Sequence, residues 1–255
     1  MRIRYNPQAR PELAAWEYYI DEPERLRGRW AQQFARPQPM ALELGCGKGG
    51  FMAQMAPAHP ETNFIALDIK SEMLVLAKRK AEEAYAAAGR PMDNLLMTAV
   101  DIERIFLIMD ENDRFGEIYI NFCPPCPKCR QHKHRLTHPR QLERYQKLMA
   151  PEGKLYFKTD DDDLFMASLE YLRESGWTLD YCTHDLHREG APVESPKTEH
   201  EEMFSRQRIA IKFLIASPPA EQKIISEEKK NAPERPESRC LGGRLTWYGW
   251  GGARG

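Results

Sequence analysis

The chain has 255 residues, of which 42% are hydrophobic and 29% are charged, and its formal net charge is −1. This length is enough for one sizeable α/β domain with appendages, and the near-neutral balance excludes a uniformly basic or acidic protein. No stretch approaches the roughly 20 apolar residues that span a bilayer. The first residues also lack the apolar core of a secretory signal. We therefore expect a cytoplasmic protein with no membrane association.

Alternating strand and helix patterns follow the first 38 residues. Strands are predicted from apolar runs, several rich in β-branched and aromatic residues, at 40–44, 63–68, 94–101, 117–122, 154–160, 177–183 and 208–216. Helices are predicted at 51–58, 71–88, 139–149, 163–174 and 198–204. This alternation predicts an α/β, Rossmann-like fold, a seven-stranded, mostly parallel sheet with helices on both faces. The last two strands lack a clear full helix between them, which favours an antiparallel strand at the sheet edge.

Composition divides the chain into three parts. Residues 1–38 form a leader rich in Pro and Arg, and residues 39–216 contain the predicted α/β domain. Residues 217–255 are rich in Pro, Glu, Lys and Ser and then in Gly, which predicts a disordered tail.

A ligand site is predicted where the first three strands end. Gly45 and Gly47 lie in the loop GCGKGG and allow a tight turn that a ligand can approach closely. Glu43, just before this loop, suits a cationic ligand but would oppose a pyrophosphate. Asp68 ends the next strand, where it can accept ribose hydroxyls, and Asp101 follows the third strand, where it can receive an adenine amine. Together they predict an S-adenosylmethionine site.

Basic residues are concentrated after the fourth predicted strand, and between Cys123 and Lys147 only Glu143 opposes them. Clustered cations gain affinity for polyanions by releasing the counterions of phosphates, so we predict a nucleic-acid partner. A solvated helix face is the alternative. The residues expected to contact phosphates are Lys128, Arg130, Lys133, Arg135 and Arg140.

Four separated segments, in order, resemble the bacterial tRNA (guanine-N7)-methyltransferases from about Met40 to Ala216. They are ELGCGKG, the strand ending INF with its basic stretch, FKTD, and the late T-x-x-E. The resemblance implies a monomeric or homodimeric enzyme that uses S-adenosylmethionine to methylate a guanine in the variable loop of tRNA. It also implies a substrate pocket lined by Asp160, Thr198 and Glu201.

One segment departs from the family pattern. The usual Asp-Pro-Trp-Pro after the fourth strand is Pro124-Pro125-Cys126-Pro127 here. The resemblance gives the usual aspartate a part in holding the guanine, and Asn121, three positions earlier, is the candidate that supplies a polar contact to cofactor or substrate instead. Two alternatives stay open: a catalytically weak tRNA-binding protein of the same fold, or a methyltransferase acting on another RNA or a small molecule.

Two further patterns suggest metal sites, but for each of them we prefer an explanation without a metal. Cys123, Cys126 and Cys129 have the spacing C-x2-C-x2-C, and C-x2-C is a frequent zinc half-site. A second cysteine pair is lacking, however, and the intervening prolines stiffen the loop. The acidic run 160–163 is better explained as a site residue followed by helix-capping carboxylates. We therefore predict no metal.

Overall fold

The computed structural model describes residues 4–219, all within one unit, Met1–Ala220. Its strands are β1 (Met40–Leu44), β2 (Asn63–Asp68), β3 (Leu95–Ala99), β4 (Phe115–Asn121), β5 (Met149–Thr159), β6 (Thr178–Thr183) and β7 (Lys212–Ser217). Its α-helices are α1 (Ala9–Ala14), α2 (Met52–Ala58), α3 (Ser71–Ala88), α4 (Pro139–Leu148), α5 (Asp162–Glu174), α6 (Leu186–Glu189) and α7 (Glu199–Arg206). Short 3-10 turns are η1 (Pro23–Leu26), η2 (Trp30–Gln33), η3 (Ile102–Leu107) and η4 (Cys129–His134).

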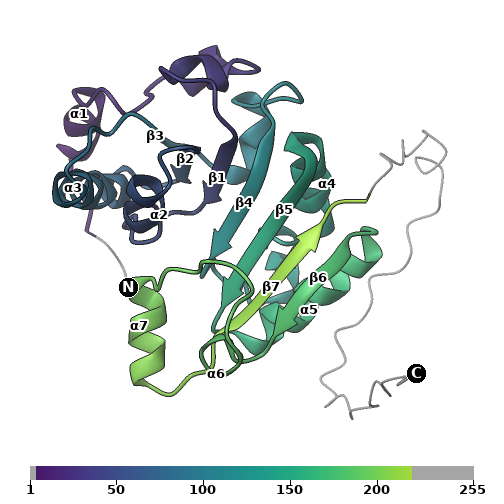
Figure 1. Cartoon of the computed structure of the whole chain (residues 1–255). Helices are drawn as coiled ribbons and strands as arrows, with labels where there is room; N and C mark the ends of the chain where they lie inside the picture. The colour runs from purple at the N-terminus through teal and green to yellow at the C-terminus, as the bar shows by residue number, and fades with distance from the viewer. Residues whose placement is uncertain (1–3, 220–255) are drawn as a thin grey trace, which may run out of the picture. The chain divides into compact units, whose positions relative to one another are not determined.

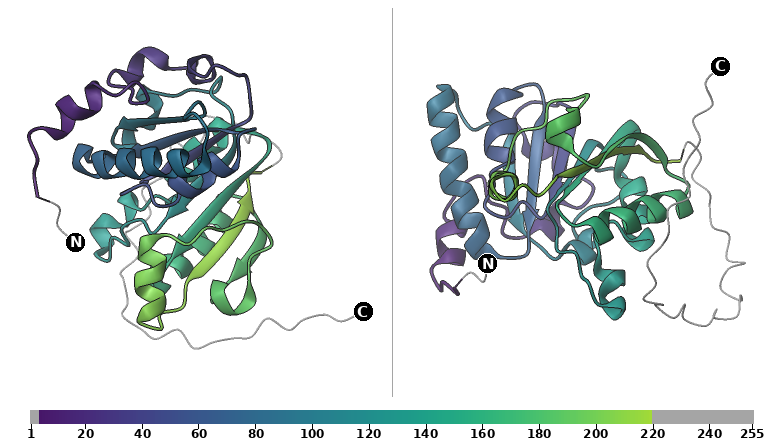
Figure 2. Two further views of the ribbon diagram at one scale, coloured as in Figure 1. Left: turned by 60° about the vertical axis from the view of Figure 1, so that its left-hand side comes forward. Right: turned by 90° about the horizontal axis from the view of Figure 1, so that it is seen from below.

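The strands form one seven-stranded sheet in the order β3-β2-β1-β4-β5-β7-β6. Neighbours from β3 through β5 pair in parallel. Helices lie on both sides of the sheet (Figure 2). The predicted mostly parallel α/β fold is therefore confirmed.

The antiparallel strand, β7, lies inside the sheet. It pairs antiparallel with both β5 and β6, and in Figure 1 it runs against β4 and β5, whose carboxyl ends point toward α7. The predicted antiparallel pairing at the edge of the sheet is confirmed, and β6 rather than the last strand is the edge strand. All residues of β7 except the last are buried, as an interior strand requires, whereas β6 exposes its first three residues and forms the edge.

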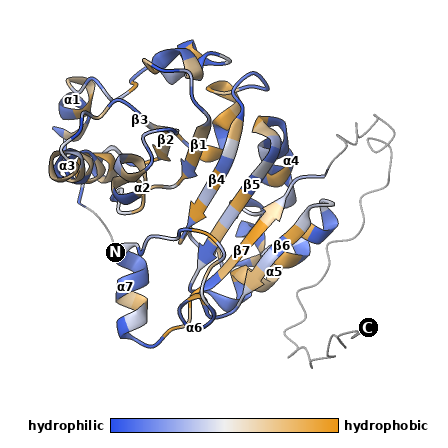
Figure 3. Ribbon diagram, viewed as in Figure 1, coloured by the Kyte–Doolittle hydropathy of each residue, from blue (hydrophilic) through white to orange (hydrophobic). Residues whose placement is uncertain are grey.

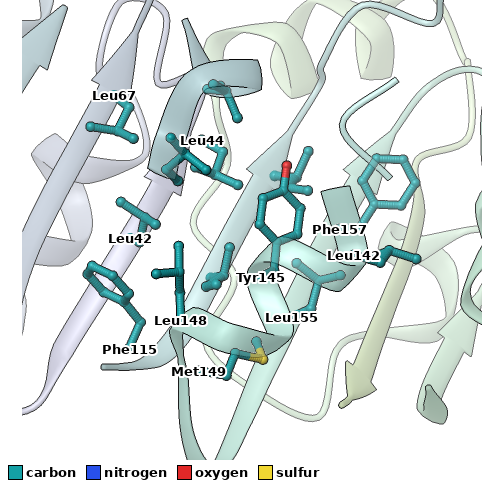
Figure 4. Close-up of a cluster of buried hydrophobic side chains, with 14 of the residues drawn as sticks. Leu42, Leu44, Leu67, Phe115, Leu142, Tyr145, Leu148, Met149, Leu155 and Phe157 are labelled. Atoms are coloured by element: carbon teal, nitrogen blue, oxygen red, sulfur yellow. The ribbon is translucent and has the colours of Figure 1, made fainter. Parts of the chain in front are cut away.

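Alternate strand residues pack on opposite faces of the sheet, as the two-residue repeat of a strand dictates. Leu42 and Phe157 belong to the core cluster under α4, whose Tyr145 is fully buried there (Figure 4). Their neighbours Ala41 and Tyr156 face the other cluster, which includes side chains of α1, α2 and α3. The two hydrophobic clusters, one on each face of the sheet, fix the positions of the strands and therefore of their carboxyl ends.

The leader packs onto the domain rather than standing apart from it. Tyr19 forms a parallel bridge with Met97 of β3, and Trp16 is buried in the core cluster on the α3 side. Trp30 is fully buried in the opposite cluster, where its indole N–H donates to the Ile108 carbonyl at 2.7 Å. The leader therefore contributes to both cores.

Across residues 4–219, no helix has the length and apolar content needed to cross a membrane. Ser217, where the tail was predicted to begin, is the last residue of β7, and the part of the predicted tail beyond position 219 lies outside the described residues.

Candidate active site

A cavity of about 420 Å³ lies at the carboxyl ends of the parallel strands. Its walls are the glycine loop after β1, the residues that follow β2 and β3, and the loop after β4 together with the start of α7. It contains all the residues predicted to bind a cofactor, namely Glu43, Gly45, Gly47, Asp68, Asp101 and Asn121. The strand order brings these residues together from positions up to 78 apart.

Glu43 is the most deeply buried carboxylate of the cavity, with 2% of the residue exposed. The Asn121 amide donates to its Oε1 at 3.1 Å. Its Oε2 is buried and has no hydrogen-bond partner among the described residues. Burial raises the pKa of Glu43 from its ordinary value near 4.5 to about 7, although the bond from Asn121 acts in the opposite direction. This unpaired oxygen is suited to accept a hydrogen bond from a positively charged group of a ligand.

The glycine loop is fixed to the end of β2. The backbone N–H of Gly47 donates to Asp68 Oδ2, and the N–H of Gly45 donates to the Leu67 carbonyl, both at 2.9 Å. Gly45 and Gly47 have φ angles of 82° and 55°, which disfavour any residue with a Cβ. A Cβ at either position would meet no atom within 4 Å, so the loop leaves open space beside it.

Asp68 and Asp101 supply carboxylates along the same wall. Asp68 accepts backbone N–H groups on both oxygens, and its burial raises the pKa despite these bonds. Both oxygens keep lone pairs for ligand hydroxyls. Asp101 accepts the Glu103 N–H at 3.0 Å and so caps η3. Ile69 and Ile102, which the sequence analysis missed, add apolar surface to the same cavity.

The three residues implied as the substrate pocket occupy different places. Thr198 lines the cavity and caps α7, where its Oγ1 accepts the Glu201 N–H at 3.2 Å. Of the residues that the structure describes, Asp160 and Glu201 are not among those lining the cavity. Asp160 follows β5, and its negative charge acts on the lining residue His200. Glu201 is fully buried.

An aromatic group that the sequence analysis missed lies at the part of the cavity formed by the loop after β4 and the start of α7. Phe122 lines it and stacks on His200, with ring centroids 6.0 Å apart and an interplanar angle of 18°. Phe204 also stacks on Phe122, with ring centroids 6.1 Å apart. Phe122 has a φ of 54°, a conformation that is costly for a bulky residue and that clusters at functional sites. No spacing in the sequence signals it.

The basic segment divides into exposed and buried residues. Lys128, Arg130, Lys133 and Arg140 are exposed. Arg135 is only 4% exposed, and its Nε donates to the Pro125 carbonyl at 2.9 Å. Its guanidinium therefore holds the loop after β4 in shape, which does not support the predicted phosphate contact at this position.

Free thiols line the same loop. Cys123 is buried, which raises its pKa to about 12, and partial burial also raises the pKa of Cys126. Both thiols therefore keep their protons near neutral pH. Within residues 4–219, no three or more His, Cys, Asp and Glu side chains are grouped so as to hold a metal ion.

Comparisons with known proteins identify relatives of this chain among methyltransferases. Residues 37–214 match a family described as "Putative methyltransferase". The chain is 50% identical over 217 residues to a tRNA (guanine-N(7)-)-methyltransferase of Clostridium perfringens (strain SM101 / Type A), covering 85% of this chain and 99% of that protein. It is 45% identical over 216 residues to the protein of the same name from Acetivibrio thermocellus, covering 85% and 99%.

Solved structures resemble the fold at low sequence identity. An antibiotic-related methyltransferase aligns with a TM-score of 0.53 and 17% identity, covering 73% of this chain and 89% of that one. The 16S rRNA methyltransferase KamB aligns with a TM-score of 0.52 and 20% identity, covering 77% and 92%. The fold, the family match and the close relatives agree, and the chain belongs to the tRNA (guanine-N7)-methyltransferase family.

Proposed function

We propose that this protein transfers a methyl group from S-adenosylmethionine to N7 of a guanine in the variable loop of tRNA. The observation that carries the proposal is the continuity of the cavity, which joins Glu43 and Asp68 to Phe122 and Thr198. A methyl donor on one side and a base on the other would meet beside Asn121. The names of the curated relatives support the same reaction.

The residues present fit S-adenosylmethionine. The unpaired Oε2 of Glu43 would accept the ammonium group of the ligand, and Asp68 would accept its ribose hydroxyls. Asp101 would receive the adenine amine between Ile69 and Ile102. When bound, the cofactor supplies an electrophilic methyl group on a sulfonium.

The substrate side needs to orient a base rather than deprotonate it. N7 of guanine carries a lone pair and no proton, so the reaction requires no strong general base. Phe122 offers a face on which the splayed base can stack, and Pro124 adds apolar surface to the cavity wall. The negative charge of Asp160, which also acts on His200, would stabilise the positive charge that develops on the ring. The rate enhancement then comes chiefly from holding guanine N7 in line with the methyl group of the cofactor.

Exposed cations are the proposed tRNA contacts. Lys128, Arg130 and Lys133 lie on the same segment that supplies Pro124 to the cavity wall, and Arg140 lies in the first turn of α4 beyond it. Phosphates bound by these side chains would bring a looped-out base to the cavity.

The test incubates purified protein with labelled S-adenosylmethionine and an unmodified tRNA transcript, followed by digestion and identification of the labelled nucleoside. We expect 7-methylguanosine at the variable loop. Label in free guanosine nucleotides without tRNA would favour the small-molecule alternative.

One observation favours the binding-protein alternative. Pro124 lines the cavity at the position where the family usually carries an aspartate, so one acceptor for the guanine edge is missing. Binding of both tRNA and cofactor without any methyl transfer would support this alternative. The Pro124→Asp variant would then be expected to transfer methyl groups where the wild type transfers none, because it restores the missing acceptor for the guanine edge.

A further inference from the structure

Lys48 is a lysine of the cavity wall that the reaction described above does not use. It lies in the glycine loop after β1, between Gly47, whose N–H donates to Asp68, and Gly49. Gly49 has a φ of 72°, and a Cβ on it would lie 2.6 Å from the Cβ of Ala77 in α3. The loop is therefore fixed to β2 on one side of Lys48 and to α3 on the other.

The same loop contacts the start of α7 and the segment that leads into it. The Gln54 side-chain amide donates to the Gly50 carbonyl at 2.7 Å and to the Lys197 carbonyl at 2.9 Å. A Cβ on Gly50 would lie 3.8 Å from Glu199 and 3.9 Å from the Nζ of Lys80. Figure 3 shows α7 as mostly hydrophilic. This end of the cavity therefore suits a polar part of a ligand.

The charge of Lys48 has no acidic partner in the described part of the chain. Lys80 pairs with Glu199, whereas no described carboxylate forms an ion pair with Lys48. Burial lowers the pKa of His200, and the charge of Lys48 lowers it further. Burial and the charge of Lys48 also lower the pKa of Lys80. An anion bound beside Lys48 would offset this mutual repulsion of cations.

Two anionic groups can enter the cavity, the carboxylate of S-adenosylmethionine and a phosphate of the RNA chain. The carboxylate of the cofactor is attached to the same carbon as its ammonium, for which Glu43 is the proposed acceptor. The charge of Lys48 is not among the main causes that shift the pKa of Glu43. It acts instead on His200, which stacks on Phe122, the proposed platform for the base. These contacts favour the phosphate.

We propose that Lys48 binds a backbone phosphate of the tRNA nucleotide whose guanine stacks on Phe122. The proposal rests on the proposed function, because only a base that enters the cavity brings its own phosphate to the glycine loop. Lys48 would add a phosphate contact inside the cavity to those of the exposed cations after β4. It would also favour a guanine within an RNA chain over free guanosine, which lacks this anion.

Replacing Lys48 separates the RNA from the cofactor. Lys48→Met should lower kcat/KM for tRNA by about 10- to 100-fold, the value of a hydrogen bond between charged groups. Its affinity for S-adenosylmethionine, measured by isothermal titration, should stay unchanged. Lys48→Arg should keep most of the activity, because a guanidinium also binds phosphate. A loss of cofactor affinity as large as the loss of kcat/KM would assign Lys48 to the carboxylate of the cofactor and overturn the proposal.

A matched control removes the same charge elsewhere. Lys154 of β5 pairs with Asp180 and does not belong to the cavity wall. Lys154→Met should change kcat/KM by no more than about twofold, because solvent and salt screen distant charges. A decrease equal to that of Lys48→Met would mean that only the total charge matters, which contradicts a contact at Lys48.

A neutral phosphate analogue identifies the partner of Lys48. Ligated tRNA can carry a methylphosphonate on the 5′ or the 3′ side of the target guanine, which removes one negative charge at a time. One of the two substitutions should weaken tRNA binding to the wild type by about 10-fold. The same substitution should change binding to Lys48→Met by no more than about twofold, because both changes remove one contact. Equal losses in the two proteins would overturn the proposal.

Filter binding keeps this comparison independent of methyl transfer. A wild type that transfers no methyl group, but whose sensitivity to the methylphosphonate disappears in Lys48→Met, would contradict the proposed reaction and support the phosphate contact. A wild type that methylates tRNA, with equal methylphosphonate losses in both proteins, would do the reverse. Lys48→Gln gives the same comparison with a polar side chain, should Lys48→Met not fold.

Discussion

At the scale of single residues, the carboxylates of the cavity differ in how many donors the protein gives them. Asp68 receives backbone N–H groups on both oxygens, whereas Glu43 receives one side-chain donor and keeps one buried oxygen unpaired. The pKa of Glu43, about 7, means that a proton and a ligand ammonium compete for this oxygen near neutral pH.

This competition predicts a pH-dependent affinity for S-adenosylmethionine. Because the ionised form of Glu43 binds the ammonium, affinity should rise roughly 10-fold between pH 6 and pH 8 and level off above the pKa. Glu43→Gln should bind more weakly and lose this dependence. Isothermal titration at three pH values measures both, and an equal slope in the two proteins would rule out Glu43 as the titrating group.

The same shift predicts a change in the stability of the ligand-free protein. The carboxyl of Glu43 titrates near 4.5 when exposed and near 7 when folded, so between these values the folded state binds more protons and the free energy of unfolding falls as pH rises. Glu43→Gln should therefore be more stable than wild type at pH 8, by up to roughly 3 kcal/mol, with a much smaller difference at pH 5. Urea unfolding at both pH values tests this, and a pH-independent difference would contradict it.

At the scale of elements, sequence patterns predicted strands and helices better than their places in the sheet. The glycine loop and the carboxylates after β1, β2 and β3 could be placed because parallel strands end at a common edge. The interior place of β7 was missed, although its run FLIA is apolar throughout while β6 alternates. Burial of Arg135 and Glu201 depends on partners 10 and 43 residues away, Pro125 and Lys158, which no local pattern reveals.

The loop after β4 provides a matched pair of basic residues. Lys133→Ala should weaken tRNA binding and reduce the slope of log affinity against log salt by about 1, with no change in thermal stability. Arg135→Ala should instead lower the melting temperature, because it removes a buried donor from the Pro125 carbonyl. Filter binding over a salt series and thermal unfolding distinguish the two. A salt slope that falls only in Arg135→Ala would reverse this assignment.

At the scale of the whole molecule, the leader belongs to the folded unit. Its extended part pairs with β3 through Tyr19, and Trp30 enters the core on the face of α4 and α5. The sequence set residues 1–38 apart by composition, because Pro and Arg hide the few apolar anchors among them.

Trp30→Ala should therefore destabilise the protein by about 3–5 kcal/mol, the usual cost of removing a fully buried aromatic side chain. Tyr5→Ala, at a leader position that is 83% exposed, should stay within about 0.5 kcal/mol of wild type. Urea unfolding gives both values. Equal stability of the two variants would mean that the leader contributes nothing to the core.

The interior position of β7 also determines the order in which strands of the sheet can pair during translation. A ribosome releases β6 before β7, yet in the described sheet β6 pairs with β7 and with no other strand. During translation β6 can pair only after residues 212–217 have inserted beside β5. Helix α7 lies between β6 and β7 in the sequence, so it cannot take its final place before then. The nascent chain can therefore form the glycine loop early, but the cavity wall at α7 is completed only when the last strand of the sheet has left the ribosome.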